Sequence, residues 1–213
     1  MSEMRVIAID GPAGSGKSTV ARAVADRLGL DYLDTGAMYR AVACAALRRG
    51  VDPGDVDAVA EVARSIDLEL TRDACVVDGV DATSDIRGAE VTGAVSVVAA
   101  NPGVRVEMVA RQRSWAAERG GGVMEGRDIG SVVFPDAALK VYLTASAEVR
   151  ARRRAGEAGG LDVVAVGVDI DRRDAAASGR ETSPMVEAPG AVVLDTSELG
   201  VDEVVDRVVG LLR

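Results

Sequence analysis

A glycine-rich run near the start of the chain has the residue types and the spacing of a phosphate-binding loop. Residues 11–19 read Gly-Pro-Ala-Gly-Ser-Gly-Lys-Ser-Thr and match the pattern G-x-x-x-x-G-K-[ST]. The apolar run Val-Ile-Ala-Ile precedes the loop at residues 6–9, and apolar residues at helical spacing follow it. Because a preceding strand and a following helix are the context in which this pattern binds phosphate, the loop predicts a nucleotide site.

Two side chains of this loop carry the expected chemistry. Lys17 would reach the β- and γ-phosphates, and the Ser18 hydroxyl would ligate Mg²⁺. Lysine occurs in the chain only at positions 17 and 140, and every other basic residue is arginine. A compact ammonium fits between phosphates where a planar guanidinium fits poorly, which favours a phosphate-binding role for Lys17.

The composition bounds the fold and excludes several classes of function. The chain has 213 residues, 48% hydrophobic and 2% aromatic, so one domain with small aliphatic side chains packed on a sheet is expected. Histidine is absent, which excludes histidine-based acid–base catalysis and histidine metal sites. The net charge of −9, without a long basic run, argues against a nucleic-acid partner.

The spacing of the cysteines and the distribution of apolar residues bear on where in the cell the protein works. Cys44 and Cys75 form no Cys-x-x-Cys pair and are expected to be core residues in a reducing environment. The sequence contains neither a signal-peptide pattern nor an apolar run of about 18 residues or more. We therefore expect a cytoplasmic protein with no membrane partner.

Strand and helix patterns alternate along the chain, which predicts an α/β fold with a parallel sheet. Residues 68–71 and 75–77, with a turn at Asp78-Gly79, predict a small antiparallel excursion from that sheet. Strands of the main sheet are expected at residues 6–9, 32–33, 122–124, 140–143 and 191–194, and helices at residues 18–28, 37–49, 56–66, 91–100, 104–119, 148–155 and 201–212.

Charged side chains follow the ends of the predicted strands, where open α/β sheets place their sites. Residues 34–40 read Asp-Thr-Gly-Ala-Met-Tyr-Arg, and residues 125–130 read Glu-Gly-Arg-Asp-Ile-Gly. Arginines cluster at residues 150–154 and 172–180. Carboxylates can serve Mg²⁺ or its waters, and arginines can clamp polyphosphates. Any one arginine could equally be a solvated surface residue, but the set favours convergence on the phosphate loop.

Four segments, residues 10–18, 33–40, 125–135 and 173–184, resemble the bacterial cytidylate kinases of the nucleoside monophosphate kinase family. The phosphate loop is shared by many NTPases, whereas Leu-Asp-Thr-Gly-Ala-Met-Tyr-Arg and Gly-Arg-Asp-Ile-Gly-Ser-Val-Val-Phe-Pro are far more discriminating. The resemblance spans nearly the whole chain. It implies an enzyme of pyrimidine nucleotide metabolism that phosphorylates CMP, and also dCMP, from ATP with Mg²⁺.

The resemblance also implies a layout and a set of site residues. A single P-loop kinase domain of three α/β/α layers would have its core at about residues 1–33, 106–149 and 184–213, a monophosphate-binding lobe at about 34–105 and a lid at about 150–183. The ATP phosphates would be held by Gly11, Pro12, Ala13, Gly14, Ser15, Gly16, Lys17, Ser18 and Thr19. The acceptor nucleotide would be bound by Asp34, Thr35, Arg40, Ser96, Arg105, Arg127, Asp128, Arg173 and Arg180. The catalytic groups would be Lys17, Arg127, Arg150, Arg154 and Arg180.

Three of these residues would read the cytosine edge in the resemblance. The Asp128 carboxylate can accept from the N4 amino group, while Ser96 and Arg105 can donate to N3 and O2. Arg40 and Arg127 suit the acceptor phosphate. The attacking phosphate oxygen is already ionised, so no strong general base is required.

The chain departs from the family pattern at two positions. Glu125 stands where the family usually has aspartate, which keeps a carboxylate for a Mg²⁺-water contact. Ala177 stands where the family has an aspartate that helps hold the acceptor ribose, so the preference between ribo- and deoxyribonucleotides is open; Asp174 is retained at a different place. In the same region, residues 161–168 favour helix weakly and residues 169–183 predict a mobile segment.

Other functions are compatible with a phosphate loop. A kinase of another small metabolite, such as a sugar acid or shikimate, would lack the set of Ser96, Arg105 and Asp128. A GTPase switch would carry Asn-Lys-x-Asp after a late strand, and this sequence has none. A non-catalytic ATP-binding regulator stays an alternative because the expected lid is altered at residues 175–177, and it would bind ATP without acceptor-dependent turnover. We expect a monomer, because the predicted site is complete within one chain.

Overall fold

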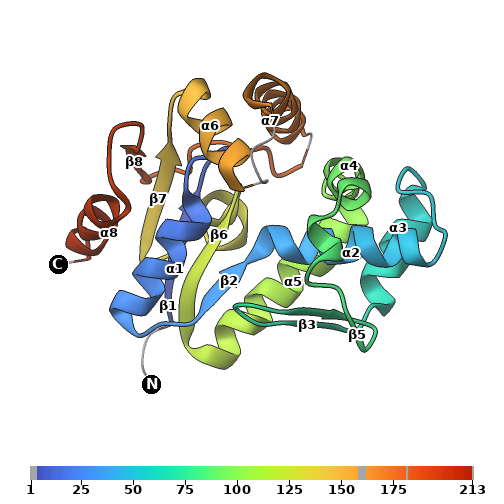
Figure 1. Cartoon of the computed structure of the whole chain (residues 1–213). Coiled ribbons are helices and arrows are strands. Elements are labelled where there is room, and N and C mark those ends of the chain that lie inside the picture. The colour runs from blue at the N-terminus through green and yellow to red at the C-terminus, as the bar shows by residue number, and fades with distance from the viewer. Residues whose placement is uncertain (1–3, 158–161, 181, 213) are drawn as a thin grey trace. The chain divides into compact units, whose positions relative to one another are not determined.

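Buried apolar strands form a five-stranded sheet in the order β2-β6-β1-β7-β8, shown in Figure 1. The strands are β1 (Arg5–Asp10), β2 (Tyr32–Asp34), β6 (Gly121–Gly126), β7 (Leu139–Thr144) and β8 (Val192–Asp195). The computed structural model describes residues 4–157, 162–180 and 182–212, and the chain divides into two units, Met1–Tyr32 with Ala116–Arg213, and Leu33–Trp115.

Strand β1 is the centre of the first unit. It pairs in parallel with β6 on one side and with β7 on the other, and β7 pairs in parallel with β8. Residues 6–10 are all buried, because helices or loops cover both faces of a parallel sheet. The predicted parallel α/β fold is therefore confirmed.

Two helices bury their apolar faces against this sheet. Helix α1 (Lys17–Leu28) contributes Val20, Ala21, Val24 and Ala25 to a core cluster that also holds Ile7 and Ile9 of β1, Val141 and Leu143 of β7, and Val204, Val205 and Val208 of helix α8 (Val201–Gly210). Gly29 ends α1 with φ 63°, a left-handed conformation that glycine adopts without strain, and its N–H donates to the carbonyls of the last turn. The expected small aliphatic core is present.

The region expected to form a lid, residues 150–183, is more helical than the sequence predicts. Helix α6 (Ala147–Glu157) is followed by α7 (Val163–Ser178), so the prediction of a mobile segment at residues 169–183 is wrong for residues 169–178. Leu161, where the weak helix was expected to begin, lies outside the described residues. Ile170 and Ala177 of α7 are buried, and α7 packs on α6, so tertiary burial outweighs a weak intrinsic propensity.

The second unit combines helices with a small antiparallel sheet. Its helices are α2 (Thr35–Arg48), α3 (Val56–Ser65), α4 (Ala89–Val98) and most of α5 (Pro102–Arg119), with the 3₁₀ turn η1 (Asp85–Arg87). The strands β3 (Leu68–Leu70), β4 (Cys75–Val77) and β5 (Val80–Asp81) pair antiparallel in that order, as expected from the turn at Asp78 and Gly79, both of which have positive φ.

A buried carboxylate fixes the loop that follows β6. Asp10, at the end of β1, accepts from the N–H of Ile129 and of Gly130, both at 2.8 Å, where the π-helical turn η2 (Ile129–Val133) begins. Asp10 is 3% exposed, and this burial raises its pKa to about 6 in spite of the two hydrogen bonds. The end of the central strand therefore holds the start of η2.

None of the helices in the described ranges is long and apolar enough to span a membrane. The two cysteines, Cys44 and Cys75, are buried thiols.

Replacing Asp10 is expected to destabilise the protein. Asp10→Ala removes the acceptor of two hydrogen bonds to a charged group, so the free energy of unfolding at neutral pH should fall by about 3 kcal/mol. Asp10→Asn keeps one acceptor oxygen and should lose less. Urea denaturation measures both, with Asp206→Ala as the control, because its exposed pair with Arg27 is worth at most about 1 kcal/mol. Equal stability of the Asp10 and Asp206 variants would contradict the assignment.

Candidate functional site

The backbone of the phosphate loop adopts conformations that require glycine. Gly11, Gly14 and Gly16 have φ values of 145°, 74° and 87°. A Cβ atom on Gly11 would lie 2.0 Å from the carbonyl oxygen of Leu143, and one on Gly14 would lie 2.6 Å from that of Arg150. Side chains are therefore excluded at these positions, and the loop can wrap closely around a small anion.

Lys17 lies at the N-terminus of α1 with its ammonium turned back over the loop. Its Nζ donates to the carbonyl oxygen of Pro12 at 2.6 Å. Removal from water and repulsion by Arg127 lower the pKa of Lys17 to about 8, although Glu125 and Asp174 oppose the shift. The loop thus holds a cation that gains much from a bound anion.

Ser18 and Glu125 place two oxygen ligands side by side. The Ser18 hydroxyl donates to Oε2 of Glu125 at 2.9 Å, and the Tyr32 hydroxyl is bonded to Oε1. No group of three His, Cys, Asp or Glu residues that could hold a metal occurs in the described ranges. Hard oxygen donors in small number suit Mg²⁺, which shares its coordination with waters and phosphates. Ser18 and Glu125 therefore fit the metal that the loop implies.

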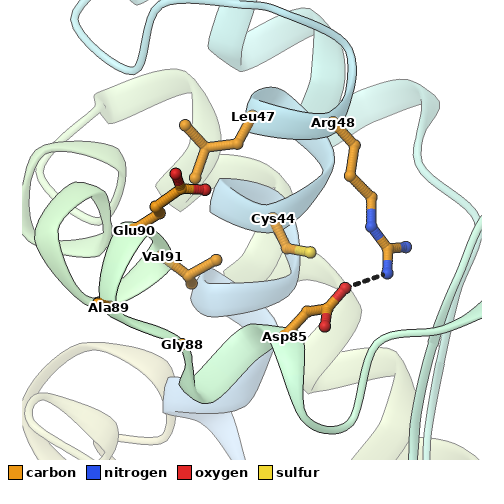
Figure 2. A pocket seen from close by; sticks show the side chains of 8 residues that line it. All are labelled: Cys44, Leu47, Arg48, Asp85, Gly88, Ala89, Glu90 and Val91. Carbon is orange, nitrogen blue, oxygen red and sulfur yellow. Dashed lines mark hydrogen bonds and ion pairs between the residues drawn. The ribbon is translucent and has the colours of Figure 1, made fainter.

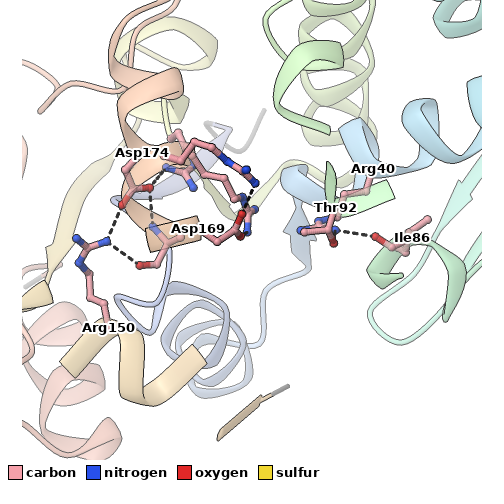
Figure 3. A network of polar contacts seen from close by, with 10 residues as sticks. Arg40, Ile86, Thr92, Arg150, Asp169 and Asp174 are labelled. Atoms are coloured by element: carbon pink, nitrogen blue, oxygen red, sulfur yellow. Dashed lines mark hydrogen bonds and ion pairs between the residues drawn. The ribbon is translucent and has the colours of Figure 1, made fainter. Parts of the chain in front are cut away.

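Two arginines of the first unit, Arg127 and Arg150, meet at one carboxylate beside the loop. Arg150 of α6 donates to Asp174 of α7 at 2.6 Å, as Figure 3 shows, and also to the carbonyl oxygen of Ala13 at 3.1 Å. Arg127, after β6, pairs with the same carboxylate. Burial, together with repulsion by Arg127 and Arg154, lowers the pKa of Arg173. The site is therefore strongly cationic.

Three other predicted site residues of the first unit, Asp128, Arg154 and Arg180, lie on or beside its helices. Asp128 is buried next to η2, and its backbone oxygen accepts from the N–H of Val132. Arg154 lies on α6, and Arg180 follows the end of α7. The structure thus brings Lys17, Ser18, Arg127 and Arg150 together around the loop or its carboxylates.

The other predicted acceptor residues belong to the second unit, where several hold the fold together. Asp34 caps α2 by accepting from the N–H of Ala37, and Thr35 is the first, buried residue of that helix. Arg40 donates to the carbonyl oxygen of Ile86 at 2.8 Å and to Oγ1 of Thr92 at 3.0 Å (Figure 3). These partners orient the Arg40 guanidinium.

Arg105 and Ser96 lie on neighbouring helices of the same unit. Arg105, on α5, is 4% exposed, donates to the carbonyl oxygen of Ala99 and lies 5.5 Å from the centre of the Tyr39 ring. Ser96 is on α4 and half-buried. A buried guanidinium of this kind is a well-oriented donor for a planar polar ligand.

A hollow of about 340 Å³ lies elsewhere in the second unit. Figure 2 shows it between α2 and the segment from η1 to α4, with the Arg48–Asp85 ion pair at its edge. Its lining residues are Cys44, Leu47, Arg48, Asp85, Gly88, Ala89, Glu90 and Val91. None of the predicted acceptor residues lines it, so this hollow is separate from the predicted acceptor site.

The sequence analysis missed residues that support the loop. Thr196, 2% exposed, donates to the carbonyl oxygen of Ser15 at 3.1 Å and accepts from Arg153 at 2.9 Å. Asp10 and Tyr32 were missed as well. Their place in the sequence could have identified two of them, because Asp10 and Thr196 each follow the apolar residues of a parallel strand, where sites of α/β sheets lie.

The low pKa of Lys17 predicts that anion binding weakens at alkaline pH. With a pKa of about 8, Lys17 loses its proton as the pH rises, and a polyphosphate then has to drive its reprotonation. Affinity for ATP should fall by up to about 20-fold between about pH 7.5 and about pH 9.5. Calorimetric titration measures this, and Lys17→Met should bind weakly without that pH dependence. An equal fall in both proteins would contradict the role of Lys17.

Two solved structures with a similar fold share little sequence identity with this chain. An uncharacterized protein from Eubacterium ventriosum has a TM-score of 0.57 at 12% identity, with 98% of each chain covered. A gluconokinase from Sinorhizobium meliloti has a TM-score of 0.53 at 15% identity, covering 100% of this chain and 93% of that chain. This likeness concerns the fold alone and agrees with the predicted P-loop α/β class.

The sequence comparisons are much closer. A family model described as cytidylate kinase matches residues 7–213. The chain is 49% identical to a cytidylate kinase of Mycolicibacterium paratuberculosis, covering 100% of this chain and 97% of the relative. It is 50% identical to one of Geobacillus kaustophilus, covering 97% and 96%. Because both kinds of match extend over nearly the full length, this chain belongs to the cytidylate kinase family.

Proposed function

We propose that this protein transfers the γ-phosphoryl group of ATP to CMP, and also to dCMP, with Mg²⁺ as cofactor. The observation that carries the proposal is the cationic phosphate loop, in which Lys17, Arg127 and Arg150 gather next to the oxygen pair of Ser18 and Glu125. Relatives about half identical to the chain are named cytidylate kinases, which supports CMP as the acceptor.

The reaction asks the protein mainly for positioning and charge neutralisation. The loop N–H groups and Lys17 would hold the ATP phosphates while an ionised oxygen of CMP attacks the γ-phosphorus and the bond to ADP breaks. Arg127 and Arg150 would balance the charge on the transferred group, joined by Arg154 and Arg180. Mg²⁺, held by Ser18 with Glu125 beside it, supplies charge neutralisation when bound. A closed lid would exclude water and so limit ATP hydrolysis.

The acceptor site is proposed on the family pattern. We assign cytosine recognition to Ser96, Arg105 and Asp128, and acceptor-phosphate binding to Arg40 and Arg127. Asp34, Thr35, Arg173 and Arg180 complete the acceptor set, with residues 34–105 as the monophosphate-binding lobe and residues 150–183 as the lid. We further propose a monomer that works in the cytoplasm in pyrimidine nucleotide metabolism; the two buried thiols are consistent with a reducing compartment.

Acceptor-dependent ADP release tests this function. With Mg²⁺ and ATP, CMP or dCMP should stimulate ADP release, whereas UMP, AMP and shikimate offered separately should do so far less. Lys17→Ala should lower kcat/KM by about 100- to 1,000-fold, because one preorganised charge donor is worth about 3 kcal/mol in the transition state.

Lys140→Ala is the matched control, since Lys140 is the other lysine of the chain and donates to the carbonyl oxygen of Pro189 at 2.8 Å. Stimulation by shikimate would show that the phosphate acceptor is shikimate and not CMP. ATP binding without stimulation by any acceptor would favour a non-catalytic regulator. Near-normal turnover by Lys17→Ala would contradict the assignment of the loop.

Ala177 predicts weak discrimination between CMP and dCMP. A site built to bond a hydroxyl rejects the analogue without it by a factor of about 10⁴, whereas a site without that polar group does not. Ala177 is 1% exposed and offers no side-chain acceptor. The ratio of kcat/KM for CMP to that for dCMP should therefore lie within about threefold of one. A ratio above about 30 would show that another group holds the ribose 2′-hydroxyl.

A further inference from the structure

The Asp174 carboxylate sits where the phosphate loop offers a donor to an anion. Its Oδ1 accepts from the N–H of Ala13 at 3.1 Å and from Arg127, and its Oδ2 accepts from Arg150 at 2.6 Å. The side chain is 13% exposed. A loop N–H and two guanidinium groups are also the donors that a phosphate oxygen prefers.

Asp174 differs from the other carboxylates of its helix in this respect. Asp169 pairs with Arg173 at 4.0 Å, and the exposed Asp171 lies 3.6 Å from Arg150. Among the described residues, no hydrogen bond or ion pair joins either of these carboxylates to the phosphate loop, whereas Asp174 accepts from the N–H of Ala13. Asp174 therefore differs from Asp169 and Asp171 in its contact with the loop, although all three carry the same charge.

The bond to Ala13 distinguishes this contact from an ordinary structural ion pair. Pairing Arg127 with Arg150 would need only a carboxylate between two guanidinium groups. Here the same oxygen that meets Arg127 also takes the Ala13 N–H, 161 residues away in the chain. A bound anion and the Asp174 carboxylate therefore exclude each other at this N–H, because both are negative and both need the same donor.

We propose that Asp174 is an internal competitor of the nucleotide phosphates. The carboxylate holds the Ala13 N–H, Arg127 and Arg150 in an anion-binding arrangement, and an incoming polyphosphate displaces it. Three hydrogen bonds to the carboxylate are exchanged for three to phosphate oxygens, and the carboxylate turns to water. Because Asp174 belongs to α7, occupation of the loop is coupled to the position of that helix. The inference rests on the proposed function only in taking the polyphosphate to be that of ATP.

Neutralising Asp174 should therefore tighten polyphosphate binding. In the full chain, Asp174→Asn is expected to lower the Kd for ATP, and separately for inorganic tripolyphosphate, by about fivefold or more. Isothermal titration calorimetry without any acceptor measures both. Glu148→Gln is the matched control, because it removes an equal charge from the adjoining helix α6, where Glu148 pairs with the exposed Arg152. Its Kd should stay within about twofold of the wild-type value.

Unchanged or weaker binding by Asp174→Asn would overturn the proposal and make Asp174 a residue that only positions the arginines. Equal tightening by Glu148→Gln would also overturn it, because net charge would then be the cause. Asp174→Ser repeats the test with a smaller neutral side chain, so the result does not depend on the folding of one variant. A protein that binds tripolyphosphate as expected but shows no CMP-dependent turnover would contradict the proposed function and leave this inference intact.

Discussion

The positive charge gathered at the phosphate loop is the constraint on which the rest of the first unit depends. Two like charges about 4 Å apart near a protein surface repel by about 4 kcal/mol, so the cluster has to be balanced within the fold. Asp10, Glu125 and Asp174 all act on the charge of Lys17, and they come from β1, β6 and α7. Strands β1 and β6 and helix α7 are thus tied to one electrostatic requirement.

The strand order alone places Asp10 and Glu125 close to each other. β1 and β6 are neighbours, with Ile9 opposite Glu125 and Asp10 opposite Gly126 in the register. Their parallel direction brings both carboxyl ends to the edge of the sheet where the phosphate loop begins. Asp10 then serves two purposes, since it is a negative charge near Lys17 and the anchor of η2.

Local pattern predicted most of the sheet and its helices, because buried parallel strands and amphipathic helices leave clear periodicities. It failed at residues 169–178, where small and charged residues become helical only through packing on α6. The loop glycines and Lys17 were predictable from spacing. The partners of Asp174 were not predictable from spacing. Arg150 lies 24 residues away in the sequence and Arg127 lies 47 residues away, and no local pattern links such distant positions.

The alanine at position 177 is explained in part by what packs around it. Its carbonyl oxygen accepts from the N–H of Met185 at 2.9 Å, and the Met185 sulfur accepts from Arg127 at 3.2 Å. Ala177 is almost fully buried, so a carboxylate there would have to be desolvated beside this segment or displace it. The small side chain lets residues near 185 pass close to α7 and cover Arg127. Arg127 is consequently held by the Met185 sulfur on one side and by the Asp174 carboxylate on the other.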